Sequence, residues 1–269
     1  MPEIESQPTS FGEPPARPSG HDLLAGRTVV VTAAAGTGIG FATARRCVEE
    51  GARVVISDRH ERRLAEAALS LAEVAGEPPL AIPCDVTDRV QVEALFDGVV
   101  DAYGGFDVVV NNAGLGGTAN VVDMTDEQWN AVLGVTLTGT FLCMRAALRH
   151  LEAQGHGVVI NNASVLGWRA QAGQAHYAAA KAGVMALTRC AAVEVAHSGV
   201  RVNAVAPSIA MHEHLAKVTS DELLDELASR EAFGRAAEPW EVANVIIFLA
   251  SDYSSYMTGE VLSVSSQHP

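Results

Sequence analysis

The sequence predicts an α/β fold, in which one domain is built on a doubly wound parallel sheet with helices on both faces. From residue 26 onward, short β-branched segments alternate with longer segments of helical periodicity. The strand-like segments are apolar along their length, as strands are when helices cover both faces of a sheet. No internal repeat and no Pro/Gly-rich linker divides residues 21–269, so we expect a single domain there.

The expected elements follow one another in a regular order. Strands are expected at 27–32, 52–58, 80–86, 106–114, 157–164, 200–207 and 259–264, and helices at 40–51, 61–76, 88–104, about 125–151, 175–197 and 238–251. The strands are rich in Val and Ile, which fit a buried pleated surface. Gly51 and Gly76 stand where the first two helices should end, and Pro239 lies in the first turn of the last helix.

Two segments fall outside this alternation. Residues 1–20 are rich in Pro, Gly, Ser and Glu, a composition that predicts a disordered N-terminal arm. Residues 208–236 form a charged, helical insertion between the sixth strand and the last helix. An insertion of this kind near a binding site predicts a helical substrate lid.

The composition excludes several classes of protein. Of 269 residues, 48% are hydrophobic and 19% are charged, as in a soluble globular enzyme, and the net charge of −14 argues against nucleic acid or an anionic membrane as a partner. No apolar run approaches about 20 residues, and the N-terminus lacks the blocks of a secretory signal, so we expect a cytoplasmic protein. Four scattered cysteines without a C-x-x-C pair predict free thiols, and no metal site is expected.

A glycine-rich loop follows the first strand in "VVVTAAAGTGIG" and opens the first helix. Gly36, Gly38, Ile39 and Gly40 would let a dinucleotide pyrophosphate approach the backbone and the N-terminus of that helix. Asp58 ends the second strand, where it would bind the adenosine ribose hydroxyls and repel a 2′-phosphate, which favours NAD. The adjacent Arg59 could receive that phosphate, so NADP stays open as a second choice.

Several motifs resemble those of the short-chain dehydrogenase/reductase family, in the family's order along residues 24–264. "AAGTGIG" resembles the family's glycine loop, with Ala34 in place of its first glycine. The resemblance implies a Rossmann-type fold and further cofactor contacts. These contacts are Asp85 and Val86 of "CDVTD", Asn112, Ala113 and Gly114 of "NNAG", and Pro207 and Ile209 after the sixth strand, where Ser208 replaces a usual glycine.

Ser164, Tyr177 and Lys181 form the expected catalytic group. Tyr177 and Lys181 are four residues apart on one face of a helix, and Ser164 ends the preceding strand. A tyrosine is a poor base at neutral pH, and a nearby ammonium lowers its pKa. The resemblance implies that Lys181 also holds the nicotinamide ribose. Thr136 stands where the family usually has an asparagine that binds a relay water, and it is a further catalytic candidate.

The expected activity is the interconversion of a secondary alcohol and a ketone. The stretches "NNASVLGWRAQAGQAHYAAAKAGVMALTRC" and "AFGRAAEPWEV" resemble a subgroup that acts on hydroxy-indenoyl-CoA intermediates of bacterial steroid ring degradation. The substrate would then be a ring alcohol on a bicyclic CoA thioester, oxidised to the ketone. Two alternatives remain open, an NADPH-dependent 3-oxoacyl-thioester reductase and a non-catalytic NAD-binding protein. Family resemblance also implies a homodimer or homotetramer.

Overall fold

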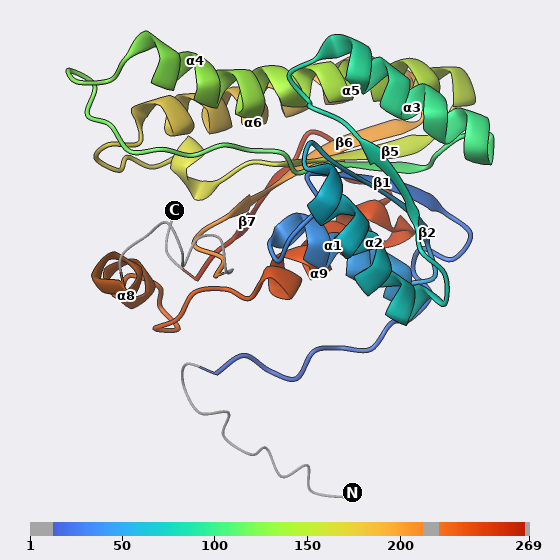
Figure 1. The fold of residues 1–269 in the computed structure, drawn as a ribbon, viewed down its shortest axis with the longest axis horizontal. Helices are drawn as coiled ribbons and strands as arrows, with labels where there is room; N and C mark the ends of the chain where they lie inside the picture. The colour runs from blue at the N-terminus through green and yellow to red at the C-terminus, as the bar shows by residue number, and fades with distance from the viewer. Residues whose placement is uncertain (1–12, 212–220, 267–269) are drawn as a thin grey trace, which may run out of the picture.

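The computed structural model describes residues 13–211 and 221–266, and their backbone forms a seven-stranded parallel sheet (Figure 1). The strand order is β3-β2-β1-β4-β5-β6-β7. The strands are β1 (Thr28–Thr32), β2 (Arg53–Asp58), β3 (Leu80–Pro83), β4 (Val108–Asn111), β5 (Gly157–Asn162), β6 (Val200–Pro207) and β7 (Val261–Val264). The order reverses between β1 and β4, so the predicted doubly wound sheet is confirmed, with its ligand crevice expected at that reversal.

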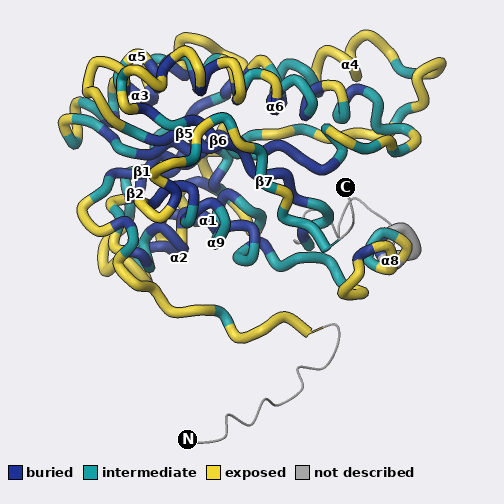
Figure 2. The backbone as a smooth tube through the Cα atoms, turned by 180° about the vertical axis from the view of Figure 1, so that it is seen from behind, coloured by how far each residue is buried: buried dark blue, intermediate teal, exposed yellow. Residues whose placement is uncertain are grey.

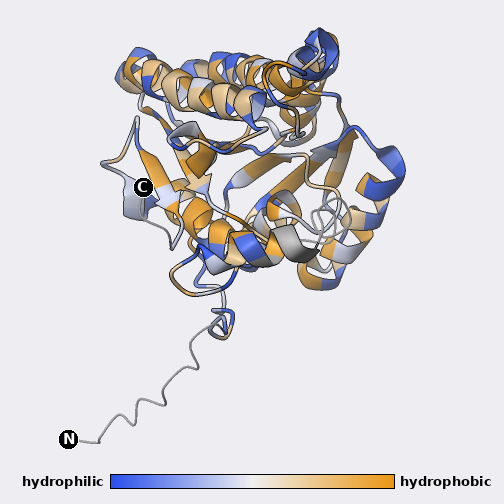
Figure 3. Cartoon of the chain, turned by 90° about the vertical axis from the view of Figure 1, so that its left-hand side faces the viewer, coloured by the Kyte–Doolittle hydropathy of each residue, from blue (hydrophilic) through white to orange (hydrophobic). Residues whose placement is uncertain are grey.

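Helices cover both faces of the sheet, as expected (Figure 1). One layer holds α1 (Ile39–Glu49), α2 (Glu61–Ala75) and α9 (Pro239–Ala250), and the other holds α3 (Arg89–Tyr103), α4 (Asp126–Leu133), α5 (Gly139–Gln154) and α6 (Ala175–Val195). α8 (Asp221–Ser229) lies apart from both layers. Two apolar cores, one on each side of the sheet, account for the buried centre in Figure 2 and the hydrophobic strands in Figure 3.

Local signals in the sequence set the ends of several helices. Gly76 has φ 84 and ends α2 in the left-handed conformation. Thr125 and Gln128 form a capping box at the start of α4, and Glu238 and Glu241 form another ahead of α9. Three of the four free cysteines are buried, while Cys190 is exposed.

A π-helical turn at Gly134–Thr138 joins α4 to α5 without a break. The joined helix, Asp126–Gln154, has 29 residues and is long and apolar enough to cross a membrane by length and composition alone. The sequence predicted one long helix at about 125–151, and the structure has this helix, with the π-helical turn inside it. Of the most apolar stretch of this helix, 56% is buried. The helix packs against α3 and α6, so its apolar residues form part of the core.

The chain before β1 contacts the C-terminal end of α1. We call residues 17–23 the N-terminal strap. Arg17 pairs with Glu49 at 2.7 Å, and Arg46 donates to the Pro18 carbonyl at 3.2 Å. The buried Glu50 pairs with Arg46 at 2.5 Å and accepts two backbone N–H groups of the strap at 2.8 and 3.2 Å. The buried charges are therefore paired and hydrogen-bonded, as burial requires.

Candidate active site

The loop between β1 and α1 is shaped to receive an anion. Gly36 has φ 115 and open space around the position of a Cβ atom, and Gly38 precedes α1 in extended conformation. No side chain caps α1 and no acidic residue lies in its first turn, which begins at Ile39. The backbone N–H groups of that turn are therefore available to a phosphate, and the loop fits the pyrophosphate of a dinucleotide.

Gly40 allows α1 to approach the ends of β1 and β4 closely. A Cβ atom at this position would lie 2.4 Å from the Ala33 carbonyl oxygen and 2.4 Å from Asn112 Nδ2. Asn112 Nδ2 donates to that same carbonyl at 3.0 Å, and Ala33 has φ 50, a rare conformation for a residue with a side chain. The loop is thus held by the side chain of Asn112, which follows β4, as well as by its own glycines.

Asp58 lies at the end of β2 beside this loop and is only 8% exposed. One carboxylate oxygen accepts the backbone N–H of Ala35 at 3.4 Å, and the other accepts that of His60 at 2.9 Å. Arg59 is exposed, and its Nε lies 3.4 Å from His60 Nε2. The structure therefore fixes the carboxylate at the edge of the loop and leaves the arginine at the surface.

The remaining expected cofactor residues also follow the carboxyl ends of strands. Asp85 accepts hydrogen bonds from the Thr87 backbone N–H and hydroxyl at 2.9 and 2.7 Å, and Val86 is buried. The backbone N–H groups of Asn112 and Ala113 donate to the Thr32 hydroxyl at 3.0 and 3.4 Å. Pro207 ends β6, and the Ile209 carbonyl accepts the Ala237 N–H at 2.9 Å. All of them lie at the sheet edge where the crevice is expected.

Ser164, Tyr177 and Lys181 come together at the same edge. Ser164 follows β5, its Oγ accepts the Leu166 N–H at 3.2 Å, and its side chain is hydrogen-bonded to Tyr177. Lys181, one turn further along α6, is 3% exposed. Its Nζ lies 5.5 Å from the centre of the Tyr177 ring and donates to the Asn162 carbonyl oxygen at 2.5 Å. A serine hydroxyl, a phenol and an ammonium thus converge as the spacing predicted.

Burial shifts the pKa values of both Tyr177 and Lys181. Burial raises the pKa of Tyr177, with the Ser164 hydrogen bond opposing the shift, and it lowers the pKa of Lys181 to about 8. In the cofactor-free protein Tyr177 therefore holds its proton at neutral pH. A protonated phenol beside a serine hydroxyl can donate to a carbonyl oxygen, which is the acid required for reducing a ketone.

Thr136 lies in the π-helical turn and is fully buried. Its hydroxyl donates to the Leu115 carbonyl at 3.1 Å and accepts the Leu115 N–H at 3.0 Å. A Cβ atom at Gly114 would lie 3.5 Å from Lys181 Nζ and 3.9 Å from Thr136 Oγ1, so Gly114 sits between these two groups. Leu115 takes the only proton of the hydroxyl and one lone pair, which leaves one lone pair for a water. The relay role of Thr136 stays a prediction.

Two residues of this region, Asn162 and His176, were not predicted from the sequence. Asn162 supplies the carbonyl that binds Lys181, and its polarity at the end of an apolar strand was a usable signal. His176 is 1% exposed, and its Nδ1 accepts the backbone N–H of Tyr177 at 2.9 Å, which fixes the first turn of α6. A lone histidine beside a tyrosine gave no such signal.

The predicted lid, 208–236, is described in part, since 212–220 lie outside the described residues. Its two ends meet in a parallel bridge between Ala210 and Ala237. α8 belongs to it, and Glu231 accepts the backbone N–H and hydroxyl of Ser266 at 3.2 and 2.8 Å. The described part of the segment is therefore anchored to the sheet and to the chain after β7.

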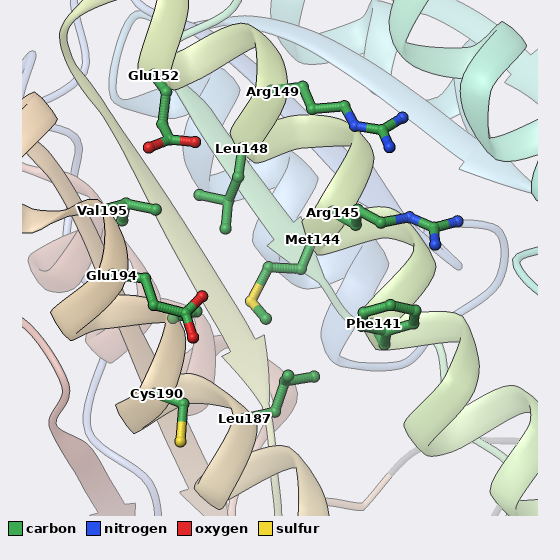
Figure 4. A pocket seen from close by; sticks show the side chains of 11 residues that line it. Phe141, Met144, Arg145, Leu148, Arg149, Glu152, Leu187, Cys190, Glu194 and Val195 are labelled. Carbon is green, nitrogen blue, oxygen red and sulfur yellow. The ribbon is translucent and has the colours of Figure 1, made fainter.

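A separate hollow lies between α5 and α6, away from the predicted site residues (Figure 4). It is lined by Phe141, Met144, Arg145, Leu148, Arg149, Glu152, Leu187, Cys190, Ala191, Glu194 and Val195. Arginines from α5 face outward at one rim, and glutamates from both helices lie at the other (Figure 4). The hollow contains none of the catalytic or cofactor candidates.

Comparison with known proteins gives the class of the chain. The family model described as "Enoyl-(Acyl carrier protein) reductase" matches residues 33–266. A crystal structure of a short chain dehydrogenase from Mycobacterium smegmatis shares 58% sequence identity at a TM-score of 0.86, covering 96% of this chain and 100% of that one. The chain belongs to the short-chain dehydrogenase/reductase family, and it is an oxidoreductase that uses a nicotinamide cofactor, NAD or NADP.

Two curated relatives are similar over most of their length. The (5R,7aS)-5-hydroxy-7a-methyl-1-oxo-2,3,5,6,7,7a-hexahydro-1H-indene-carboxyl-CoA reductase of Mycobacterium tuberculosis is 63% identical over 256 residues, 95% of this chain and 98% of the relative. The cis-4-hydroxycyclohexanecarboxylate dehydrogenase of Sinomonas cyclohexanicum is 44% identical over 247 residues, 90% of this chain and 96% of the relative. The names of both relatives specify a substrate with a hydroxyl group and a carboxyl group on a ring.

Proposed function

We propose that this protein interconverts a ring hydroxyl and a ketone on a bicyclic CoA thioester, with NAD as its cofactor. The observation that carries the proposal is the hydrogen-bonded pair Ser164–Tyr177 with Lys181 one turn away, at the edge of the sheet that holds the glycine loop. The substrate class comes from the 63% identity with the indene-carboxyl-CoA reductase.

The three side chains divide the work on the reacting oxygen. In reduction, the Tyr177 hydroxyl donates its proton to the carbonyl oxygen, and in oxidation its phenolate removes the proton of the alcohol. Ser164 hydrogen-bonds the same oxygen and so orients the reacting carbon. Lys181 would hold the nicotinamide ribose and, while protonated, favours the phenolate. A nicotinamide cofactor, when bound, accepts or supplies the hydride.

The preference for NAD rests on Asp58. Its buried carboxylate is held toward the glycine loop by the Ala35 N–H, and there it would repel a 2′-phosphate. Replacing it in Asp58→Ser should shift the ratio of kcat/KM for NAD to that for NADP by about 10-fold or more toward NADP, since one charge repulsion is removed. Arg59→Ala is the matched control and should lower any residual NADP use. A ratio unchanged by Asp58→Ser would contradict this assignment.

The activity itself is tested by a substrate panel with NADH and NADPH absorbance as the readout. The panel holds keto- and hydroxy-indane-carboxyl-CoA thioesters, their free acids and 3-oxoacyl thioesters. NAD-dependent turnover of the ring thioester supports the proposal. NADPH-driven reduction of 3-oxoacyl thioesters alone would favour the biosynthetic reductase, and cofactor binding without turnover on any member would favour the non-catalytic alternative.

The hollow between α5 and α6 supports an assembly of two or more copies. Phe141, which lines the hollow, exposes its apolar side chain, 39% of which is accessible. Arg145 and Arg149 on one rim and Glu194 on the other give a face with opposite charges, which a two-fold axis could pair with itself. Light scattering of the purified protein tests this, and a monomer at micromolar concentration would contradict it.

A further inference from the structure

A chain of hydrogen bonds connects Lys181 to the glycine loop through Asn162. The Asn162 carbonyl oxygen accepts from Lys181 Nζ at 2.5 Å. Its side-chain Nδ2 donates to Asn112 Oδ1 at 3.0 Å, and Asn112 Nδ2 donates in turn to the Ala33 carbonyl at 3.0 Å. One residue thus contacts the catalytic lysine with its backbone and, through Asn112, the start of the loop with its side chain.

We propose that Asn162 is a positioning residue for the cofactor. The proposal rests on the proposed function, in which Lys181 holds the nicotinamide ribose and the glycine loop holds the pyrophosphate. Since the backbone carbonyl and the amide of Asn162 belong to one residue at the end of β5, they fix the distance between these two contacts. A dinucleotide that must meet both contacts binds best when that distance is set in advance.

The close packing of α1 against Asn112 connects this series of hydrogen bonds to the anion-binding loop. Asn112 Nδ2 lies so near Gly40 that a Cβ atom there would come within 2.4 Å of it. A shift of the Asn112 amide therefore changes the space available to the first turn of α1. Asn162 holds that amide in place by occupying its Oδ1.

The amide of Asn162 is not explained by stability. Its Oδ1 is buried and has no hydrogen-bond partner among the described residues, and an unpaired buried acceptor destabilises the folded chain. The neighbouring Asn161 faces the opposite side of β5, where its Oδ1 accepts from Asn111 at 2.9 Å and its Nδ2 donates to the Thr188 hydroxyl at 2.9 Å. Asn161 therefore has the paired, buried amide of a structural residue, whereas Asn162 does not.

The two adjacent asparagines provide a matched pair of variants, Asn162→Val and Asn161→Val. Three quantities are measured for each, namely the Tm of the cofactor-free protein, the Kd of NADH by fluorescence titration, and kcat. Asn162→Val removes one unpaired buried oxygen, its own Oδ1, and leaves the partly buried Asn112 Oδ1 without its donor, so its Tm should stay within about 2 °C of the wild type. Its Kd for NADH should rise by about 10- to 100-fold, because the glycine loop and Lys181 are no longer held at a fixed distance from each other.

Asn161→Val should give the opposite result, a lower Tm with an NADH Kd within about twofold of the wild type, because it leaves Asn111 Nδ2 without its acceptor. An unchanged NADH Kd in Asn162→Val would overturn the positioning role, and so would a Kd that weakens only in step with a loss of Tm. A wild-type protein that binds neither NADH nor NADPH would remove the proposed function together with this inference.

Discussion

Replacing Gly40 by alanine should damage both the fold and the cofactor loop. The added Cβ would lie 2.4 Å from the Ala33 carbonyl and 2.4 Å from Asn112 Nδ2, whereas ordinary contacts are about 3.4 Å or longer. Because both contacts must be relieved, α1 should move by about 1 Å and the Asn112–Ala33 hydrogen bond should break. Overpacking costs about 1–3 kcal/mol and a lost hydrogen bond about 0.5–1.5 kcal/mol, so the variant should be roughly 2–4 kcal/mol less stable.

Thermal unfolding and NADH titration measure the two effects together. For a chain of this size the loss corresponds to a Tm lower by about 4–10 °C, and displacement of the α1 N-terminus should weaken NADH by about 10-fold or more. Gly134→Ala is the matched control, because Gly134 is helical, with φ −56 and ψ −51, and has nothing within 4 Å of the new Cβ. Its Tm should be unchanged or higher. A Gly40→Ala variant with the Tm and the NADH Kd of the control would refute the reasoning.

Three further predictions concern the catalytic group and the N-terminal strap. Tyr177→Phe should lower kcat by about 100-fold or more while the NADH Kd stays within about threefold, and substantial residual turnover would show that another group moves the proton. Because burial lowers the pKa of Lys181 to about 8, the unfolded chain binds more protons than the folded one between pH 8 and the unfolded pKa near 10.4. Denaturant unfolding of the cofactor-free wild type should therefore give about 1 kcal/mol more stability at pH 9 than at pH 7, and Lys181→Met should lose this rise. Deleting residues 1–20 should leave kcat unchanged and lower the Tm by about 2–6 °C, since Arg17 and Pro18 no longer contact Glu49 and Arg46; a large fall in kcat would instead connect the strap to the active site.

The sheet and the spatial meeting of Ser164, Tyr177 and Lys181 were predictable because their signals are local. Apolar β-branched runs, glycines at helix ends and Pro239 in the first turn of α9 each act within a few residues of where they stand. The spacing of Tyr177 and Lys181 fixes their shared helix face, and a strand end places Ser164 beside them. Geometry of this kind follows from helix and strand periodicity alone.

The features that escaped prediction depend on partners far away in the sequence. The amide of Asn162 meets Asn112, which is 50 residues earlier, and Glu50 meets backbone groups 27 and 29 residues before it. The π-helical turn at Gly134–Thr138 also has no local signature, although it places Thr136 against Leu115. Periodicity predicted the helix there but not the change of hydrogen-bonding pattern within it.

The bridge between Ala210 and Ala237 holds the two ends of the intervening segment next to each other. Its two ends are joined by backbone hydrogen bonds of 2.9 Å, from Met211 N–H to the Ala237 carbonyl and from Ala237 N–H to the Ile209 carbonyl. The length of a loop whose ends are already fixed changes folding stability only slowly, so this stretch can be exchanged for that of a relative as a cassette. Exchanging it should therefore leave the sheet and the meeting of Ser164, Tyr177 and Lys181 in place.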